Sequence, residues 1–88
     1  GNRGYYSDIA ITFSLNLLRD LAADASSAKD IADGLWERNI TYLLVNYELF
    51  NFWVKEYSLH EKQMLKDFFE QQTVTEFSKD KYGLLRVL

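Results

Sequence analysis

The sequence contains no cysteine and only one histidine. Without cysteine the chain cannot form disulfides, iron–sulfur clusters or thiolate zinc sites, and it has no cysteine nucleophile. A single histidine also disfavours a transition-metal site made from protein ligands alone. We therefore expect neither a metal nor a cofactor.

Proline is absent, and the glycines are at positions 1, 4, 34 and 83. These positions form neither a GxGxxG loop nor a Walker-type phosphate-binding loop. No linker, repeat or low-complexity tract divides the chain, so we expect a single helical domain over residues 1–88. The chain begins with Gly instead of Met and ends in the apolar run 84–88. These ends leave two alternatives open, a C-terminus docked on the core or a fragment of a longer protein.

No apolar run approaches the roughly 20 residues of a membrane-spanning helix, and no signal-peptide pattern opens the chain. The net charge is −3 and the pI is about 5.0, so the bulk charge does not favour nucleic acid as a partner. We expect a cytoplasmic domain without a membrane partner, and we rank a protein, either another chain or a second copy in a homodimer, ahead of nucleic acid.

Hydrophobic residues make up 48% of the chain and aromatic residues 16%, which is enough for a dense core in a short domain. Apolar segments are separated by helix-capping residues, with few glycines and no proline, a pattern typical of helical bundles. The predicted fold class is all-α, a compact bundle of four to five short helices around a central aromatic-rich helix. The helices are expected over residues 8–24, 28–38, 40–57, 59–72 and 74–87. Residues 9–15 also alternate as in a strand, and residues 74–88 also fit a hairpin with its turn at 80–83.

The strongest local signal is the capping box Ser58-Leu59-His60-Glu61, in which the Ser58 hydroxyl and the Glu61 carboxylate each accept a backbone N–H from the other residue. Thr73-Val74-Thr75-Glu76 has the same spacing and predicts the start of the last helix. The other helices are expected to begin after Ser7, after Ser26 or Ser27, and after Asn39.

Projected as a helix, residues 40–57 carry an apolar arc wider than the roughly 100° stripe of a surface helix, interrupted by Asn46. Either this is the central helix of the bundle, fully covered by the others, or a partner covers part of it. On the second interpretation Val45 and Phe52 lie one above the other and form a seam. The predicted partner-binding residues are Trp36, Val45, Phe52, Trp53 and Tyr57.

The sequence offers few groups for catalysis. His60 lies in the first turn of a predicted helix, with no nucleophile or orienting partner at a recognisable spacing. The acidic residues Asp30, Asp33 and Glu37 share one helix face, but the alternating oxygen ligands of a calcium loop are missing. We therefore interpret the acidic face as solvated. The predicted function is a non-enzymatic protein–protein interaction module, either a homodimer or an adaptor or inhibitor of a larger partner.

The segment Ser27-Ala28-Lys29-Asp30-Ile31-Ala32-Asp33-Gly34-Leu35 resembles the first helix of the helix-turn-helix in winged-helix transcription factors. The resemblance implies an alternative fold, a winged-helix-like α+β domain with a C-terminal hairpin, and an alternative function, a small DNA-binding transcriptional regulator. Its recognition helix would then be 40–57, which lacks the basic and amide side chains that read DNA. A hairpin over 74–88, with Lys79 and Lys81 at its tip, would be the wing.

Overall fold

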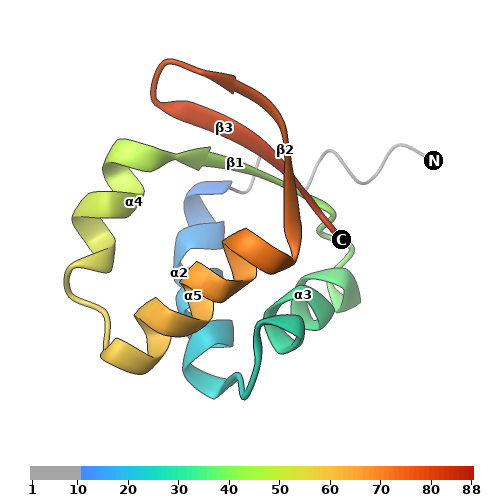
Figure 1. Cartoon of the computed structure of the whole chain (residues 1–88), viewed down its shortest axis with the longest axis vertical. Helices are drawn as coiled ribbons and strands as arrows, with labels where there is room; N and C mark the ends of the chain where they lie inside the picture. Colours follow the sequence, from blue (N-terminus) through green and yellow to red (C-terminus); the bar gives the residue numbers. More distant parts are fainter. Residues whose placement is uncertain (1–10) are drawn as a thin grey trace.

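The computed structural model describes residues 11–88, with side chains from residue 16 onward (Figure 1). The elements follow in the order α2 (Ile11–Asp24), α3 (Ala28–Glu37), β1 (Tyr42–Asn46), α4 (Tyr47–Val54), α5 (Leu59–Gln71), β2 (Thr73–Lys79) and β3 (Tyr82–Val87). The prediction of an all-α helical bundle is therefore wrong. The described chain is an α+β domain with a three-stranded antiparallel sheet, and it is closer to the alternative with a C-terminal hairpin.

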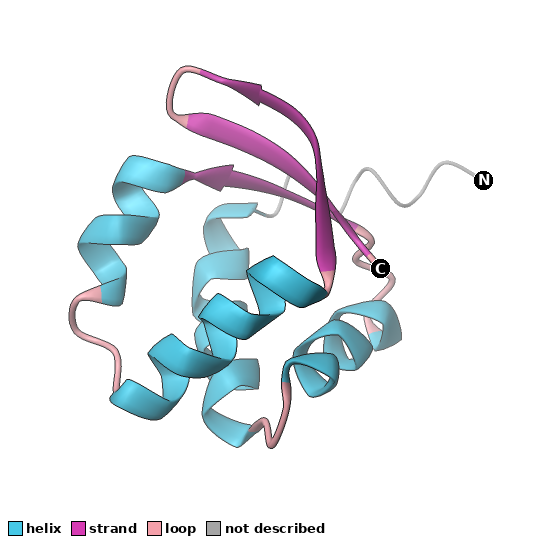
Figure 2. Cartoon of the chain, in the orientation of Figure 1, coloured by secondary structure: helices cyan, strands magenta, loops and turns pink. Residues whose placement is uncertain are grey.

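The sheet has the order β1-β3-β2, so the last strand of the chain is its central strand. Leu43 of β1 lies opposite Leu85 of β3, and Val45 lies opposite Gly83. Leu43, Val45, Leu85 and Val87 are all buried, whereas β2 is exposed along most of its length. Because side chains alternate between the faces of a strand, these residues form one apolar face. Figure 2 shows the helices on one side of the sheet and the β2–β3 turn projecting beyond them.

The predicted helix over residues 40–57 is wrong. The first difference from the prediction is at Asn39, which was expected to cap this helix. Asn39 ends α3 instead of starting a helix: its φ is 61°, in the left-handed region. Its N–H donates to the Trp36 carbonyl, and the Ile40 N–H donates to the Leu35 carbonyl. These two bonds form a Schellman motif, in which Asn tolerates the left-handed position and Ile40 folds back towards Leu35.

After this turn, residues 42–46 form a strand because their side chains alternate between inside and outside. Leu43 and Val45 are buried, and Leu44 between them is exposed. Asn46 then caps α4, since its Oδ1 accepts the Leu49 N–H at 3.0 Å. The wide apolar arc of the helical projection is therefore not a feature of one helix. It combines the apolar residues of strand β1, which point to both faces of the sheet, with those of the short helix α4.

The predicted helix over residues 74–87 is also wrong, and the alternative hairpin is confirmed. The Thr73 hydroxyl donates to the Phe69 carbonyl of α5 and caps no helix. Asp80 reverses the chain with a φ of 54°. Thr73 lies opposite Val87 and Lys79 opposite Tyr82, with an irregularity between Thr75 and Phe77. The C-terminal end is docked, because Val87 is buried and the Leu88 N–H donates to the Gln72 carbonyl.

The helices predicted over 28–38 and 59–72 are confirmed within one residue at their ends. The capping box at Ser58 and Glu61 is also confirmed, with both of its hydrogen bonds present. The predicted helix 8–24 is observed over 11–24, so residues 11–15 do not form the alternative strand. Its first three residues and its predicted cap, Ser7, lie outside the described residues.

The core lies between α2, α3 and α5 and the inner face of the sheet. Phe68 of α5 is completely buried, as are Leu18 of α2 and both Ile31 and Leu35 of α3. Ser27 precedes α3 at the N-cap position without a side-chain bond to the helix. Instead the Asp30 carboxylate accepts the Ser26 N–H at 2.9 Å. Burial of these apolar side chains, and not the capping of α3, therefore holds the three helices together.

Candidate interaction surface on helix α4

Helix α4 is the one described helix without a buried residue, although its sequence is Tyr-Glu-Leu-Phe-Asn-Phe-Trp-Val. Its inner side carries Tyr47, Phe50 and Val54, which are partly buried and pack against the core. In Figure 1, α4 lies at the edge of the molecule, and no other described element covers its outer side. The result is an unusually apolar helix with only one side packed.

The outer side carries Leu49, Phe52 and Trp53, and we call these three residues the α4 surface. The exposed fraction is 60% for Phe52, 46% for Trp53 and 37% for Leu49. The Phe52 and Trp53 rings pack edge to face, with centroids 5.9 Å apart. This contact orders two large aromatic rings that remain open to solvent.

Contacts in the first half of α4 fix its position. The Tyr47 N–H donates to the Lys81 carbonyl in the β2–β3 turn at 2.8 Å. Further along, the Phe50 ring packs edge to face on Phe69 of α5, with centroids 5.3 Å apart. The α4 surface is therefore presented by a helix tied to both the hairpin and α5.

Charged side chains border the α4 surface. Glu48 lies in the first turn, where a carboxylate is favourable for the helix dipole, and its Oε1 is 3.8 Å from Lys81 Nζ. Lys55 is the C-cap residue and keeps a right-handed helical backbone. Both side chains are exposed. Glu48 thus places a negative charge at the start of α4, and Lys55 places a positive charge seven residues later, followed by the exposed Glu56.

The structure separates the five predicted partner-binding residues. Phe52 and Trp53 are neighbours on the α4 surface. Val45 is buried in β1, so it forms no seam with Phe52. Tyr57 is buried in the connection that joins α4 to α5. Trp36 is half-exposed on α3, and its indole N–H donates to the Leu88 carbonyl at 2.9 Å.

Tyr57 belongs to a polar cluster that connects α2 to the capping box of α5. The Arg19 guanidinium lies over the Tyr57 ring, 4.7 Å from its centroid, and Arg19 Nε is 3.4 Å from Glu61 Oε1. Burial raises the pKa of Tyr57. The Ser58 backbone N–H holds the pKa of Glu61 below its usual value, and Arg19 adds to this effect. These interactions are structural, because they connect α2 to the first turn of α5.

His60 also has a structural contact. Its Nε2 lies 2.8 Å from the Ala25 carbonyl in the α2–α3 connection. A carbonyl oxygen only accepts, so this ring nitrogen is the donor. The bond ties the first turn of α5 to the end of α2.

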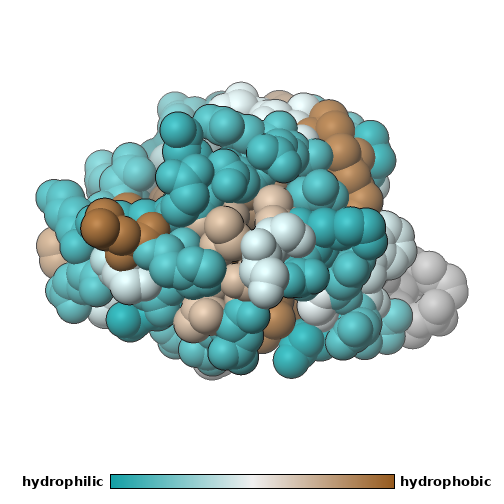
Figure 3. All heavy atoms as spheres, turned by 60° about the horizontal axis from the view of Figure 1, so that its bottom comes forward, coloured by the Kyte–Doolittle hydropathy of each residue, from teal (hydrophilic) through white to brown (hydrophobic). Residues whose placement is uncertain are grey.

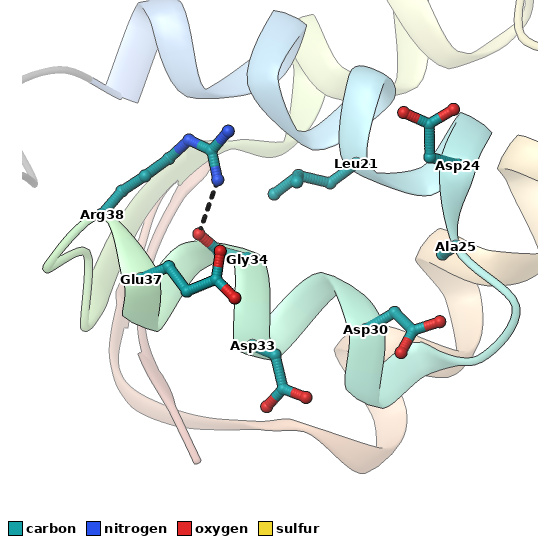
Figure 4. A pocket seen from close by; sticks show the side chains of 8 residues that line it. All are labelled: Leu21, Asp24, Ala25, Asp30, Asp33, Gly34, Glu37 and Arg38. Carbon is teal, nitrogen blue, oxygen red and sulfur yellow. Dashed lines mark hydrogen bonds between the residues drawn. The ribbon is translucent and has the colours of Figure 1, made fainter.

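The acidic residues predicted to form a solvated face border a shallow hollow of about 400 Å³ between α2 and α3 (Figure 4). The Asp33 carboxylate lies 3.2 Å from Lys29 Nζ, and the Asp30 carboxylate accepts the Ser26 N–H. The Arg38 guanidinium donates to the Gly34 carbonyl at the same hollow. Within residues 11–88, no group of three or more His, Asp or Glu side chains is arranged to hold a metal ion.

The element order also contains a helix-turn-helix. Helices α4 and α5 are joined by residues 55–58, and the β2–β3 hairpin follows. The sequence-based placement of this motif is wrong, because α3 leads into strand β1 and not into a recognition helix. Lys79 and Lys81 flank the hairpin turn, and Lys62 and Lys66 lie on α5, with Asp67, Glu70 and Asp80 interspersed. The face shown in Figure 3 is largely hydrophilic, with separate apolar spots near its sides.

Comparison of the chain with protein-family models, curated proteins and solved structures finds no match. In the described part of the chain, no helix is both long and apolar enough to cross a membrane. Two sequence signals point to the α4 surface: the inside–outside alternation of residues 42–46, and the Asn46 cap three residues before Leu49. Together they end the strand at residue 46 and begin a separate helix at residue 47.

Proposed function

We propose that the domain is a non-enzymatic protein–protein interaction module that binds its partner through the α4 surface. A single observation carries this proposal: α4 is a strongly apolar helix without a buried residue, and Leu49, Phe52 and Trp53 face solvent. Small domains rarely leave such clusters open unless the cluster is a contact site. Trp and other aromatic residues are also frequent anchors in the centre of interfaces.

The size of the surface agrees with this role. A Phe or Trp side chain has roughly 150–250 Å² of surface, so the exposed parts of Phe52 and Trp53 together amount to about 200 Å². At about 25 cal/mol per Å², their burial would contribute about 5 kcal/mol before the costs of association are subtracted. This is enough for an anchor but not for tight binding by itself.

The test is site-specific photo-crosslinking in cells that express the full chain. A photoreactive phenylalanine analogue replaces Phe52 in one variant and Phe77 in a control variant. Phe77 is a suitable control because it is also 60% exposed, but on strand β2. We expect adducts to protein from position 52 and few from position 77. Equal yields from the two positions would contradict the proposal.

A second candidate function is supported by the element order. A helix-turn-helix followed by a hairpin with lysines at its turn is the arrangement of winged-helix DNA-binding domains. On this hypothesis α5 is the recognition helix, and Lys79 and Lys81 contact phosphates. The net charge of −3 and the acidic residues among these lysines weigh against it.

The second candidate is tested by fluorescence anisotropy with a duplex of arbitrary sequence at low salt. If the candidate is right, the affinity falls steeply as salt is added, and the double variant K79A/K81A lowers the slope of log K against log salt by about two. K29A is the control, because Lys29 pairs with Asp33 on α3, away from the hairpin. Absence of binding at low salt, or equal losses in the two variants, would exclude this role.

The proposed module acts without a cofactor, and its cytoplasmic location stays a prediction.

A further inference from the structure

The charged residues Glu48 and Lys55 are placed on either side of Phe52 along α4. Glu48 and Lys55 are seven residues apart, which is almost two helical turns, so they lie on one side of α4. Phe52 lies between them, four residues after Glu48 and three before Lys55. The helical backbone continues through Lys55, whose φ and ψ are −60° and −27°. Along the row formed by Glu48, Phe52 and Lys55, α4 therefore reads negative, aromatic, positive from its N-terminus to its C-terminus. The next residue, Glu56, is also exposed and lies about 100° around the helix axis from Lys55.

We propose that the partner of the α4 surface is a second copy of this chain, bound with the two α4 helices antiparallel across a twofold axis near Phe52. This inference rests on the proposed function and names its partner. A twofold axis through the centre of this row makes the row of the second copy run in the opposite direction. Each Glu48 therefore comes beside Lys55 of the second copy. The same patch then fits itself in shape and in charge, as an isologous interface requires.

The ion pairs that Glu48 and Lys55 make within the chain are compatible with this arrangement. Glu48 has a distant partner in Lys81, at 3.8 Å, and its side chain is 79% exposed. Lys55 makes no ion pair with any described residue. Both groups can therefore pair across an interface without breaking a close contact inside the chain.

The available area sets the expected strength. A standard interface buries about 800 Å² on each partner, and the exposed parts of Phe52 and Trp53 supply about 200 Å² of apolar centre. Glu48, Asn51, Lys55 and Glu56 would form the polar rim. The dimer thus falls in the small, transient class, below about 1,200 Å² in total. We expect it to dissociate at micromolar concentrations.

The first experiment measures the mass of the full chain by sedimentation equilibrium over a hundredfold range of concentration. We expect a shift from 10.4 kDa towards twice that mass as the concentration rises. F52E should raise the dissociation constant at least tenfold, whereas F77E, at an equally exposed position, should change it less than twofold. A wild-type chain that stays monomeric, or an equal effect of the two variants, overturns the inference.

The second experiment tests the antiparallel arrangement. E48K places Lys opposite Lys in the dimer, and K55E places Glu opposite Glu, so each variant alone should dimerise several-fold more weakly. An equimolar mixture of the two should form heterodimers with wild-type affinity, because both contacts then join opposite charges. The substitutions change the net charge of −3 by two units in opposite directions, and both chains stay negative. Bulk attraction therefore does not explain recovery, and failure of the mixture to recover overturns the arrangement.

The photo-crosslinker at position 52 separates failure of this inference from failure of the proposed function. An adduct of twice the chain mass, formed by the purified protein, supports the inference. Adducts formed only with other proteins in cells, with a monomeric purified chain, overturn the second copy as partner and leave the interaction module standing. Absence of adducts in both settings overturns both proposals.

Discussion

Gly83 provides a sharp test of how α4 is held against the sheet. It lies in the central strand, opposite Val45 on one side and Ser78 on the other. The Tyr47 ring at the start of α4 packs over it, so a methyl group at position 83 would overlap Tyr47 Oη and lie 2.6 Å from Cζ. Replacing Gly83 by Ala therefore forces the Tyr47 ring away from the sheet.

The magnitude follows from two opposing effects. Overpacking of this kind costs about 1–3 kcal/mol. Alanine gains about 0.5–1 kcal/mol over glycine within a strand, because the unfolded chain has less freedom to lose. We expect G83A to lower the free energy of unfolding by about 1–2 kcal/mol. In a Y47A background the clash is gone, and G83A should be neutral or slightly stabilising.

The assay is urea unfolding of the wild type, G83A, Y47A and the double variant, followed by far-ultraviolet circular dichroism. The expected coupling energy between the two positions is about 2 kcal/mol, whereas distant positions are additive within about 0.5 kcal/mol. A coupling energy within that limit would refute the contact between the Tyr47 ring and Gly83. Dimerisation measured on G83A would then show whether displacement of Tyr47 also disturbs the α4 surface.

Three further predictions concern the core and the capping box. E61Q keeps an oxygen for the Ser58 N–H but loses the charge beside Arg19, so we expect a loss of about 1 kcal/mol at pH 7. The folded-state pKa of Glu61 is lowered, so this stabilisation is complete above the pKa of the unfolded chain. The difference in stability between wild type and E61Q should therefore shrink as the pH falls through the folded-state pKa. A constant difference in urea melts from pH 7 to pH 3 would contradict this. S58A should lower the melting temperature by an amount equivalent to about 1 kcal/mol, and no change would argue against the capping box. F68A should cost about 3–5 kcal/mol, comparable to the stability of so small a domain, and a well-folded F68A in circular dichroism would show that Phe68 is not central to the core.

Local interactions made part of this structure predictable from the sequence. The Ser58–Glu61 capping box joins residues only three positions apart, so its pattern is complete within the segment and correctly predicts the start of α5. The helices over 11–24 and 28–37 were also within reach, because their apolar residues recur at helical spacing and pack on one another. Among the predicted partner-binding residues, Phe52 and Trp53 are exposed on α4, and their role in binding stays a prediction.

The errors come from contacts between residues far apart in the chain. Residues 42–46 become a strand because β3, some 40 positions later, offers hydrogen bonds and an apolar face opposite Leu43 and Val45. Strand β1 has no partner until β3 is in place, so periodicity within residues 42–46 could not decide between helix and strand. Thr73–Glu76 copies a capping box, yet pairing with β3 outweighs it.

The sequence by itself thus determined the apolar content of the chain, helices α2, α3 and α5, and the absence of cysteine chemistry. Only the tertiary structure decided which apolar residues form the core and which remain outside. Val45 and Phe52 are similar in hydrophobicity and are seven positions apart. The sheet buries the first, whereas the second lies on a helix of which only one side is packed. Burial depends on what lies opposite a residue in space, and that is set by the whole fold.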